Sequence, residues 1–159
     1  MSRISVVDTV IGELCQSMGL ADSPLDDRGR LALRFDDTPV MFSYAAKPIE
    51  MLWLHVDLGE TPKGRAALEF LLRLGFDCWC LNRMTIGLDR DGHRAVGHSC
   101  VPVSELSLER LDQALGALLE VAVPIRERLL AGDFSIGVES MESDQRPSGG
   151  RPPRGMLRV

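Results

Sequence analysis

The stretch from Thr61 to Val103 limits the possible folds most strongly, because it contains signals for a helix followed at once by a hairpin. Thr61 is a candidate N-cap, and Pro62 suits the first helical position, where its missing N–H costs nothing. Leucines at helical spacing continue to Leu74, and Gly75 then predicts the end of the helix. We therefore predict a helix with a wide apolar face at the centre of the chain.

Two apolar runs with the composition of β-strands follow this helix, over 78–88 and 94–101. Between them lies Asp91-Gly92, a dipeptide typical of tight turns between antiparallel strands. The predicted unit is one helix that leads into one long antiparallel hairpin. Nothing in it resembles an active site, and it reads as a surface that binds a partner.

Alternating patterns before this unit predict three more strands, over 31–35, 40–44 and 51–58. Alternation with a period of two marks a strand that is buried on one face only. In the third strand the leucines and Val56 share one face, which leaves Met51 and Trp53 on the face away from the expected core. Either a partner subunit or a bound ligand would explain two large apolar side chains in that position.

Helical spacing predicts a first helix that ends at Gly19 and a last helix capped by Ser107 and ended by Gly132. Pro124 lies inside the last helix and is expected to bend it or to start a new segment. The fold class is therefore α+β, with the order α-β-β-β-α-β-β-α, a twisted antiparallel five-stranded sheet and three helices. We predict one domain over 1–134 and a disordered C-terminal tail over 135–159, which is rich in Pro, Gly, Ser and charge.

The composition excludes several classes of partner. A net charge of −5 and a pI near 5.2 argue against nucleic-acid binding, because phosphate contacts need clustered Lys and Arg. No run approaches the ~20 apolar residues of a membrane span, and we expect no membrane insertion. Without a recognisable signal peptide, the 4 cysteines are expected to be reduced thiols in a cytosolic protein.

One group of residues could be drawn as a metal or thiol site: Cys78 and Cys80 on one predicted strand, His98 and Cys100 on the next. The spacings are Cys-x-Cys and His-x-Cys, whereas common structural zinc sites leave two residues between paired ligands. Buried thiols that pack in the core are the favoured interpretation. The chain also lacks a hydrolase nucleophile elbow and a phosphate-binding loop, so we expect no enzymatic activity, no cofactor and no metal.

Several blocks of the sequence resemble the class I type III secretion chaperones of the Tir chaperone family. They are Leu71–Phe76, Thr85–Gly92 and Val101–Val103, followed by the long Leu-rich helix. The first helix and the strand Leu31–Asp37 match the usual start of the family, so the resemblance covers about residues 4–131. The departures are Asn82–Met84, where the family often has small residues, and the longer tail. The broad-specificity chaperones of plant pathogens are the subgroup that the sequence suggests.

The resemblance implies a homodimeric, ATP-independent virulence chaperone that binds the N-terminal segments of secreted effectors. It would keep them secretion-competent in the bacterial cytoplasm and deliver them to the secretion-associated ATPase, as a step in protein transport. In the family the second helix and the following strand build the dimer interface. Here that predicts an interface at Leu68, Leu71, Leu72, Trp79 and Leu81.

An extended effector segment needs apolar residues that the core of the chaperone does not itself use. The candidates for effector binding are Val6 and Val10 on the first helix, and Met41, Met51 and Trp53 on the sheet. Ordinary core or dimer packing would explain each of them equally well. The alternative functions are an interaction or adaptor domain unrelated to secretion, and a thiol or metal enzyme around Cys100.

Overall fold

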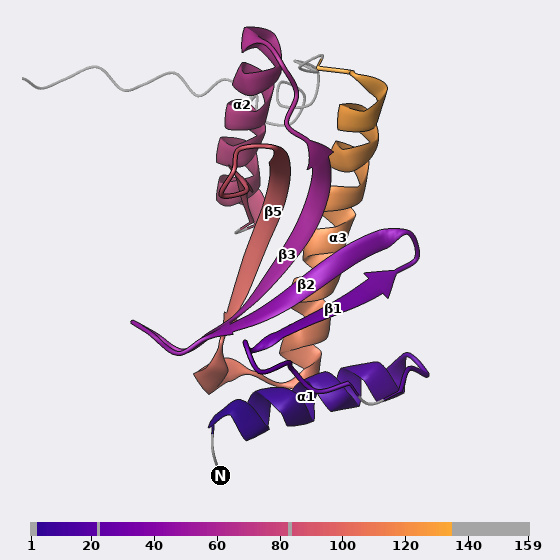
Figure 1. Cartoon of the computed structure of the whole chain (residues 1–159), viewed down its shortest axis with the longest axis vertical. Coiled ribbons are helices and arrows are strands. Elements are labelled where there is room, and N and C mark those ends of the chain that lie inside the picture. Colours follow the sequence, from indigo (N-terminus) through magenta and orange to yellow (C-terminus); the bar gives the residue numbers. More distant parts are fainter. Residues whose placement is uncertain (1–2, 22, 83, 135–159) are drawn as a thin grey trace, which may run out of the picture.

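The computed structural model describes residues 3–21, 23–82 and 84–134, and excludes the side chains of 3–5, 81 and 82. Figure 1 shows the arrangement of the helices and the sheet. The elements follow the predicted order, with a short 3₁₀ turn before the last helix: α1 (Arg3–Ser17), β1 (Arg30–Phe35), β2 (Thr38–Ala45), β3 (Met51–Glu60), α2 (Arg65–Asn82), β4 (Thr85–Leu88), β5 (Arg94–Pro102), η1 (Val103–Glu105) and α3 (Leu108–Ala131). The predicted tail over 135–159 lies outside the described residues.

The five strands form one antiparallel sheet in the order β1-β2-β3-β5-β4. β5 pairs with β3, although α2 and β4 lie between these two strands in the sequence. The central strand pair therefore joins residues that are far apart in the chain. The register places His55 opposite His98 and Trp53 opposite Cys100. β1 and β4 are the two edges of the sheet.

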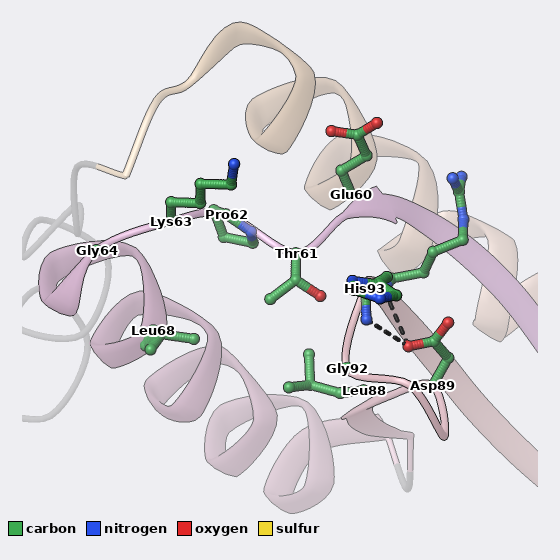
Figure 2. Close-up of a pocket in the computed structure, with 11 residues that line it drawn as sticks. Glu60, Thr61, Pro62, Lys63, Gly64, Leu68, Leu88, Asp89, Gly92 and His93 are labelled. Atoms are coloured by element: carbon green, nitrogen blue, oxygen red, sulfur yellow. Dashed lines mark hydrogen bonds between the residues drawn. The ribbon is translucent and has the colours of Figure 1, made fainter.

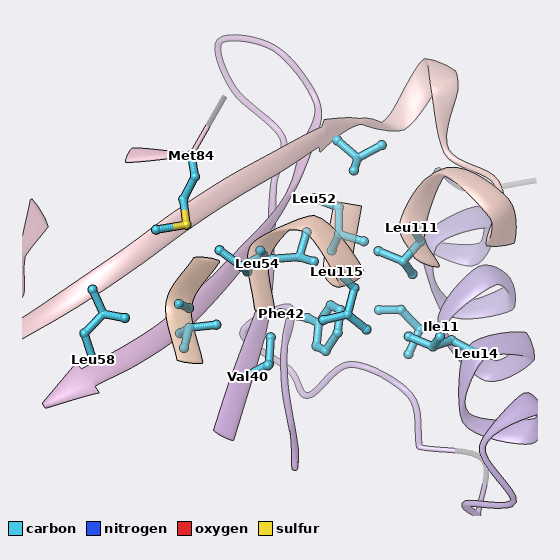
Figure 3. Close-up of a cluster of buried hydrophobic side chains, with 14 of the residues drawn as sticks. Ile11, Leu14, Val40, Phe42, Leu52, Leu54, Leu58, Met84, Leu111 and Leu115 are labelled. Carbon is cyan, nitrogen blue, oxygen red and sulfur yellow. The ribbon is translucent and has the colours of Figure 1, made fainter. Parts of the chain in front are cut away.

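One face of the sheet is the core face. On β3 the side chains of Leu52, Leu54, Val56 and Leu58 are fully buried, and α3 packs along them. Figure 3 shows Leu52 and Leu54 beside Phe42 of β2, together with labelled leucines and an isoleucine of α1 and α3. The alternation in the sequence predicted this face because every second residue of the strand points to the same side.

The predicted boundaries of α2 and β4 were wrong. α2 begins at Arg65, after Thr61 and Pro62, and it continues through Gly75 to Asn82, so the predicted strand over 78–88 is reduced to Thr85–Leu88. Gly75 lies inside the helix, and a Cβ there would make ordinary van der Waals contacts with Ile86 of β4, at 3.7 Å from its carbonyl oxygen and 3.8 Å from its Cβ. The helix is held against β4 at this point and continues, so the glycine does not end it.

The predicted last helix is confirmed at both ends. The backbone N–H of Arg110 donates to the Ser107 side chain, and Gly132 adopts the left-handed conformation with φ of 67°. α3 continues through Pro124, so no new segment begins there. Among the described helices, none is both long and apolar enough to cross a membrane.

Candidate functional site

The face of the sheet opposite the core carries no helix among the described residues. We call it the open sheet face and define it by the alternate side chains of the four long strands: Arg30 and Arg34 on β1, Met41 and Ser43 on β2, Met51, Trp53, His55 and Asp57 on β3, and Val96, His98 and Cys100 on β5. In Figure 1 β2 crosses in front of α3, so this face looks toward the viewer.

A hydrogen-bonded chain of three polar side chains crosses the middle of the open sheet face. Ser43 Oγ lies 2.7 Å from His55 Nε2, and His55 Nδ1 lies 2.8 Å from His98 Nδ1. One imidazole N–H must donate to the other ring, because two unprotonated nitrogens cannot bond. The Trp53 ring lies nearly parallel to the His55 ring, with centroids 6.3 Å apart.

The two imidazoles are uncharged at neutral pH. Burial lowers the pKa of His55 to about 4, and the neighbouring His98 and the positive charge of Arg30 act in the same direction. Burial also lowers the pKa of His98. The centre of the open sheet face is therefore polar but neutral, with an indole ring beside it.

The predicted effector-binding residues fall in two different environments. Met41 is 40% exposed on the open sheet face, and Met51 and Trp53 are partly exposed on the same face. Val6 is partly buried on α1. Val10 is only 7% exposed and packs in the core, so its side chain is not free for a client.

A second apolar surface runs along α2. Four side chains spaced by four, four and three residues form it, and we call it the α2 stripe: Leu68, Leu72, Phe76 and Trp79, with exposures of 42%, 76%, 69% and 59%. Leu71 is buried beside the stripe, and the side chain of Leu81 lies outside the described residues. The sequence prediction missed Phe76 because it placed the end of the helix at Gly75.

Two hollows border the start of the α2 stripe at Leu68, and a third, of about 430 Å³, lies beside Trp79 at its other end. An apolar pocket of about 350 Å³ between α2 and β4 is lined by Leu68, Leu71, Leu72, Ile86, Gly87 and Leu88. A larger and more polar cavity of about 910 Å³ shares Leu68 and Leu88 with it and extends to the loops at Thr61–Gly64 and Asp89–Arg94 (Figure 2). These two hollows are therefore neighbours on either side of Leu68 and Leu88, beside the edge strand β4.

The larger cavity has no catalytic arrangement among its lining residues. The Asp89 carboxylate accepts the backbone N–H of His93 at 2.7 Å and of Arg94 at 3.0 Å, and these bonds shape the β4–β5 turn. They also lower the pKa of Asp89, so the carboxylate is an anion that is used in the turn. The cavity is a surface feature of the turn region.

The alternative metal or thiol site that could be drawn from Cys78, Cys80, His98 and Cys100 does not form. Cys78 and Cys80 lie on α2 instead of a strand beside β5, and His98 pairs with His55. In the described part of the chain no group of three or more His, Cys, Asp and Glu is placed to hold a metal ion. Burial raises the pKa of both Cys78 and Cys100, which is the opposite of what a reactive thiolate needs.

An open antiparallel sheet with helices on one face and two uncovered apolar surfaces defines a protein-binding domain of the secretion-chaperone type. The model of the Tir chaperone protein (CesT) family matches residues 9–126. The chain therefore belongs to the Tir chaperone protein (CesT) family, and the predicted function as a type III secretion chaperone of effectors is confirmed. No curated protein matches the sequence closely enough to count as a relative.

Solved structures of low sequence identity share the fold. The chain in the ExsC-ExsE complex has a TM-score of 0.71 and 22% identity, over 80% of this chain and 96% of that one. The chain in the HopA1-SchA chaperone-effector complex has a TM-score of 0.68 and 20% identity, over 78% and 95%. The chain in the ExoU-SpcU complex of Pseudomonas aeruginosa has a TM-score of 0.58 and 18% identity, over 76% and 95%. These matches confirm the predicted fold class.

Proposed function

We propose that the chain works as a homodimer in the bacterial cytoplasm. It binds the N-terminal segments of effectors, keeps them extended and secretion-competent, and delivers them to the secretion-associated ATPase without catalysing a reaction. Family membership supports this proposal, and so does the HopA1-SchA match, which is described as a chaperone-effector complex.

The observation that carries the proposal is the pair of apolar surfaces that the core leaves uncovered. Soluble monomers rarely expose contiguous apolar patches of more than a few hundred Å², and larger patches mark interaction sites. The α2 stripe lies on a helix and the open sheet face on the strands, and the two surfaces meet at a hollow of about 430 Å³ that is lined by Trp79, Met51 and Cys100 among others. A partner on Leu68 and Leu72 and another on Met41 and Trp53 can therefore bind the chain at the same time.

We assign the α2 stripe to a second copy of the chain. Its four residues lie on one helix face, beside an apolar pocket of about 350 Å³ that a side chain from another molecule can fill. A two-fold axis would place the same stripe from both copies together, as isologous dimers require. This assignment leaves Leu68, Leu72 and Trp79 in the interface that the resemblance implied, and it adds Phe76.

We assign the open sheet face to the effector segment. Met41, Met51 and Trp53 supply adaptable apolar contacts along two neighbouring strands. Apolar burial contributes ~25 cal/mol per Å², and this must offset the entropy that the effector segment loses when it becomes ordered. An extended segment that crosses several strands buries enough area for that.

The experiment is affinity purification of the tagged full-length chain from its native host, with mass-spectrometric identification of bound proteins. We expect a dimer that captures secreted proteins through their N-terminal segments. The double variant Met41→Ser with Trp53→Ala should lose these proteins, whereas Leu130→Ser, at an exposed apolar position on α3, should retain them. A monomer that captures no secreted protein would overturn the proposal.

Delivery to the ATPase needs its own measurement. The purified complex of chaperone and effector segment is mixed with the secretion-associated ATPase, and co-elution is followed by size-exclusion chromatography. We expect the ATPase to bind the loaded complex. Absence of co-elution would remove the delivery step and leave effector binding in place.

A further inference from the structure

We propose that the segment recognised by the open sheet face carries an acidic side chain, Asp or Glu, between apolar residues, and that Arg30 and Arg34 on β1 select it. This inference rests on the proposed function, in which the open sheet face is the surface for the client. It goes further because it names the chemistry of the client segment and the residues that recognise it.

The first argument is the charge of this face. The whole chain is acidic, with a net charge of −5, yet the open sheet face has unbalanced cations. Arg30 and Arg34 are exposed on the same side of β1, in register with Ser43 and Pro39 of β2. In the part of the chain that the structure describes, neither arginine forms an ion pair.

The second argument is that the acid on this face is already neutralised. The Arg94 guanidinium donates two hydrogen bonds to the Asp57 carboxylate, from Nε at 3.0 Å and from the terminal nitrogen at 2.5 Å. At the start of β1, the Asp26 carboxylate accepts the backbone N–H groups of Arg28 and Arg30. Asp57 is therefore paired with Arg94, and in the described part of the chain neither carboxylate forms an ion pair with the side chain of Arg30 or Arg34.

The third argument is the field at the centre of the face. Arg30 lies close enough to His55 that its charge contributes to the lowered pKa of that imidazole. A positive field that disfavours a protonated histidine also disfavours a lysine or arginine of the client at the same place. A carboxylate of the client at this place is instead attracted by the charge of Arg30.

The apolar neighbours define the rest of the segment. Met41 is in register with His55, and Trp53 lies two residues from His55 on the same face of β3, so apolar surface flanks the histidines on two sides. An extended segment points every second side chain to the same face. The predicted pattern is therefore apolar, acidic, apolar at alternate positions.

The test uses the full-length protein and three synthetic 15-residue peptides of alternating Leu and Ser, with Glu, Gln or Lys at the central position of the leucine face. Binding is measured by fluorescence anisotropy at low and at high salt. We expect the Glu peptide to bind about two- to fivefold more tightly than the Gln peptide, as for an exposed ion pair, and the Lys peptide to bind most weakly. High salt should reduce the difference.

Variants of the arginines locate the effect. Arg30→Gln with Arg34→Gln should remove the preference for Glu, and Arg30→Glu with Arg34→Glu should reverse it in favour of Lys. Arg30→Lys with Arg34→Lys retains the charge and should retain the preference. The matched control is Arg28→Gln, an exposed arginine in the turn before β1. Circular dichroism confirms that each variant is folded.

The outcomes separate this inference from the proposed function. Equal binding of all three peptides, with loss of binding in Trp53→Ala, would overturn the acidic selection and leave the open sheet face as the client surface. Binding that is insensitive to both Trp53→Ala and Met41→Ser would overturn the client surface itself. If the Gln variants change the oligomeric mass in light scattering, the arginines contact a second copy, and the inference is overturned.

Discussion

The Nδ1 atoms of His55 on β3 and His98 on β5 lie 2.8 Å apart, so the N–H of one ring donates a hydrogen bond to the unprotonated Nδ1 of the other. A third partner, the Ser43 hydroxyl, lies 2.7 Å from the far nitrogen of His55. This hydrogen bond needs one unprotonated Nδ1, so the pair of rings can carry at most one positive charge. The stability of the contact between β3 and β5 therefore depends on pH.

We expect the free energy of unfolding to decrease as the pH is lowered from about 6.5 toward 4. Burial lowers the pKa of His55 from 6.5 to about 4 in the folded protein, so between these values the unfolded chain binds a proton that the native chain does not. Above pH 6.5 this contribution to the free energy of unfolding is constant. Urea denaturation at several pH values measures how steeply the free energy of unfolding depends on pH, and this dependence should be weaker in His55→Asn than in the wild type. The exposed His93→Asn is the control, and an equal slope in His55→Asn would contradict the prediction.

Trp53→Ala should weaken client binding much more than it destabilises the fold. Trp53 is only partly buried and lies on the open sheet face, so we expect a loss of about 1 kcal/mol in the free energy of unfolding. A large aromatic anchor at an interface contributes more, and client affinity should fall about tenfold or more. Calorimetric titration and thermal melting measure both effects. A large melting shift with unchanged affinity would show that Trp53 serves the core.

Leu72→Glu should convert a dimer into monomers without unfolding them. Leu72 is 76% exposed, so the charge costs the isolated chain about 0.5 kcal/mol or less, whereas a buried, unpaired carboxylate in a dimer interface is strongly unfavourable. Light scattering after size exclusion measures the mass. Leu130→Glu, at a similarly exposed leucine on α3, should leave the mass unchanged. If both variants stay dimeric, the α2 stripe is not the interface.

Ser107→Ala should lower the free energy of unfolding by about 1 kcal/mol, the usual contribution of an N-cap. The Ser107 hydroxyl oxygen accepts the backbone N–H of Arg110 at 3.2 Å, and this bond is lost in the variant. Ser104→Ala, at an exposed serine in the preceding turn, should change stability little. Urea denaturation of both variants decides the matter, and equal stabilities would contradict the role of the cap.

The sheet could be predicted because each of its long strands obeys a local rule. The alternation of Leu52, Leu54 and Val56 with Trp53 and His55 is visible in the sequence, and the structure buries only the first set completely. Ser107 and Gly132 are equally local signals, because a cap needs only the residues beside it.

The error at α2 came from taking Gly75 as the end of the helix. Glycine is common just after a helix, but here the helix continues through it and packs against Ile86 of β4. Phe76 and Trp79 continue the helical spacing of Leu68 and Leu72, and that pattern extends past the glycine. Local composition favoured a strand there, whereas the longer period was the better guide.

The histidine pair could not be found from the sequence. In the sequence His98 could be grouped only with the cysteines, in the alternative metal or thiol site of Cys78, Cys80 and Cys100. Its real partner, His55, is on β3, and their register is fixed only after α2 and β4 have been placed between the two strands. No local pattern specifies a cross-strand register over that distance.

The separation of the α2 stripe from the open sheet face has a consequence for affinity. If two copies pair through α2 as proposed, each copy contributes an open sheet face, and one client chain can contact both faces in succession. The second contact is then intramolecular, and its strength depends on the effective concentration set by the client residues between the two contacts. Contacts of low affinity and low specificity on each copy can in this way give a high overall affinity for a long unfolded chain, while each single contact still dissociates rapidly.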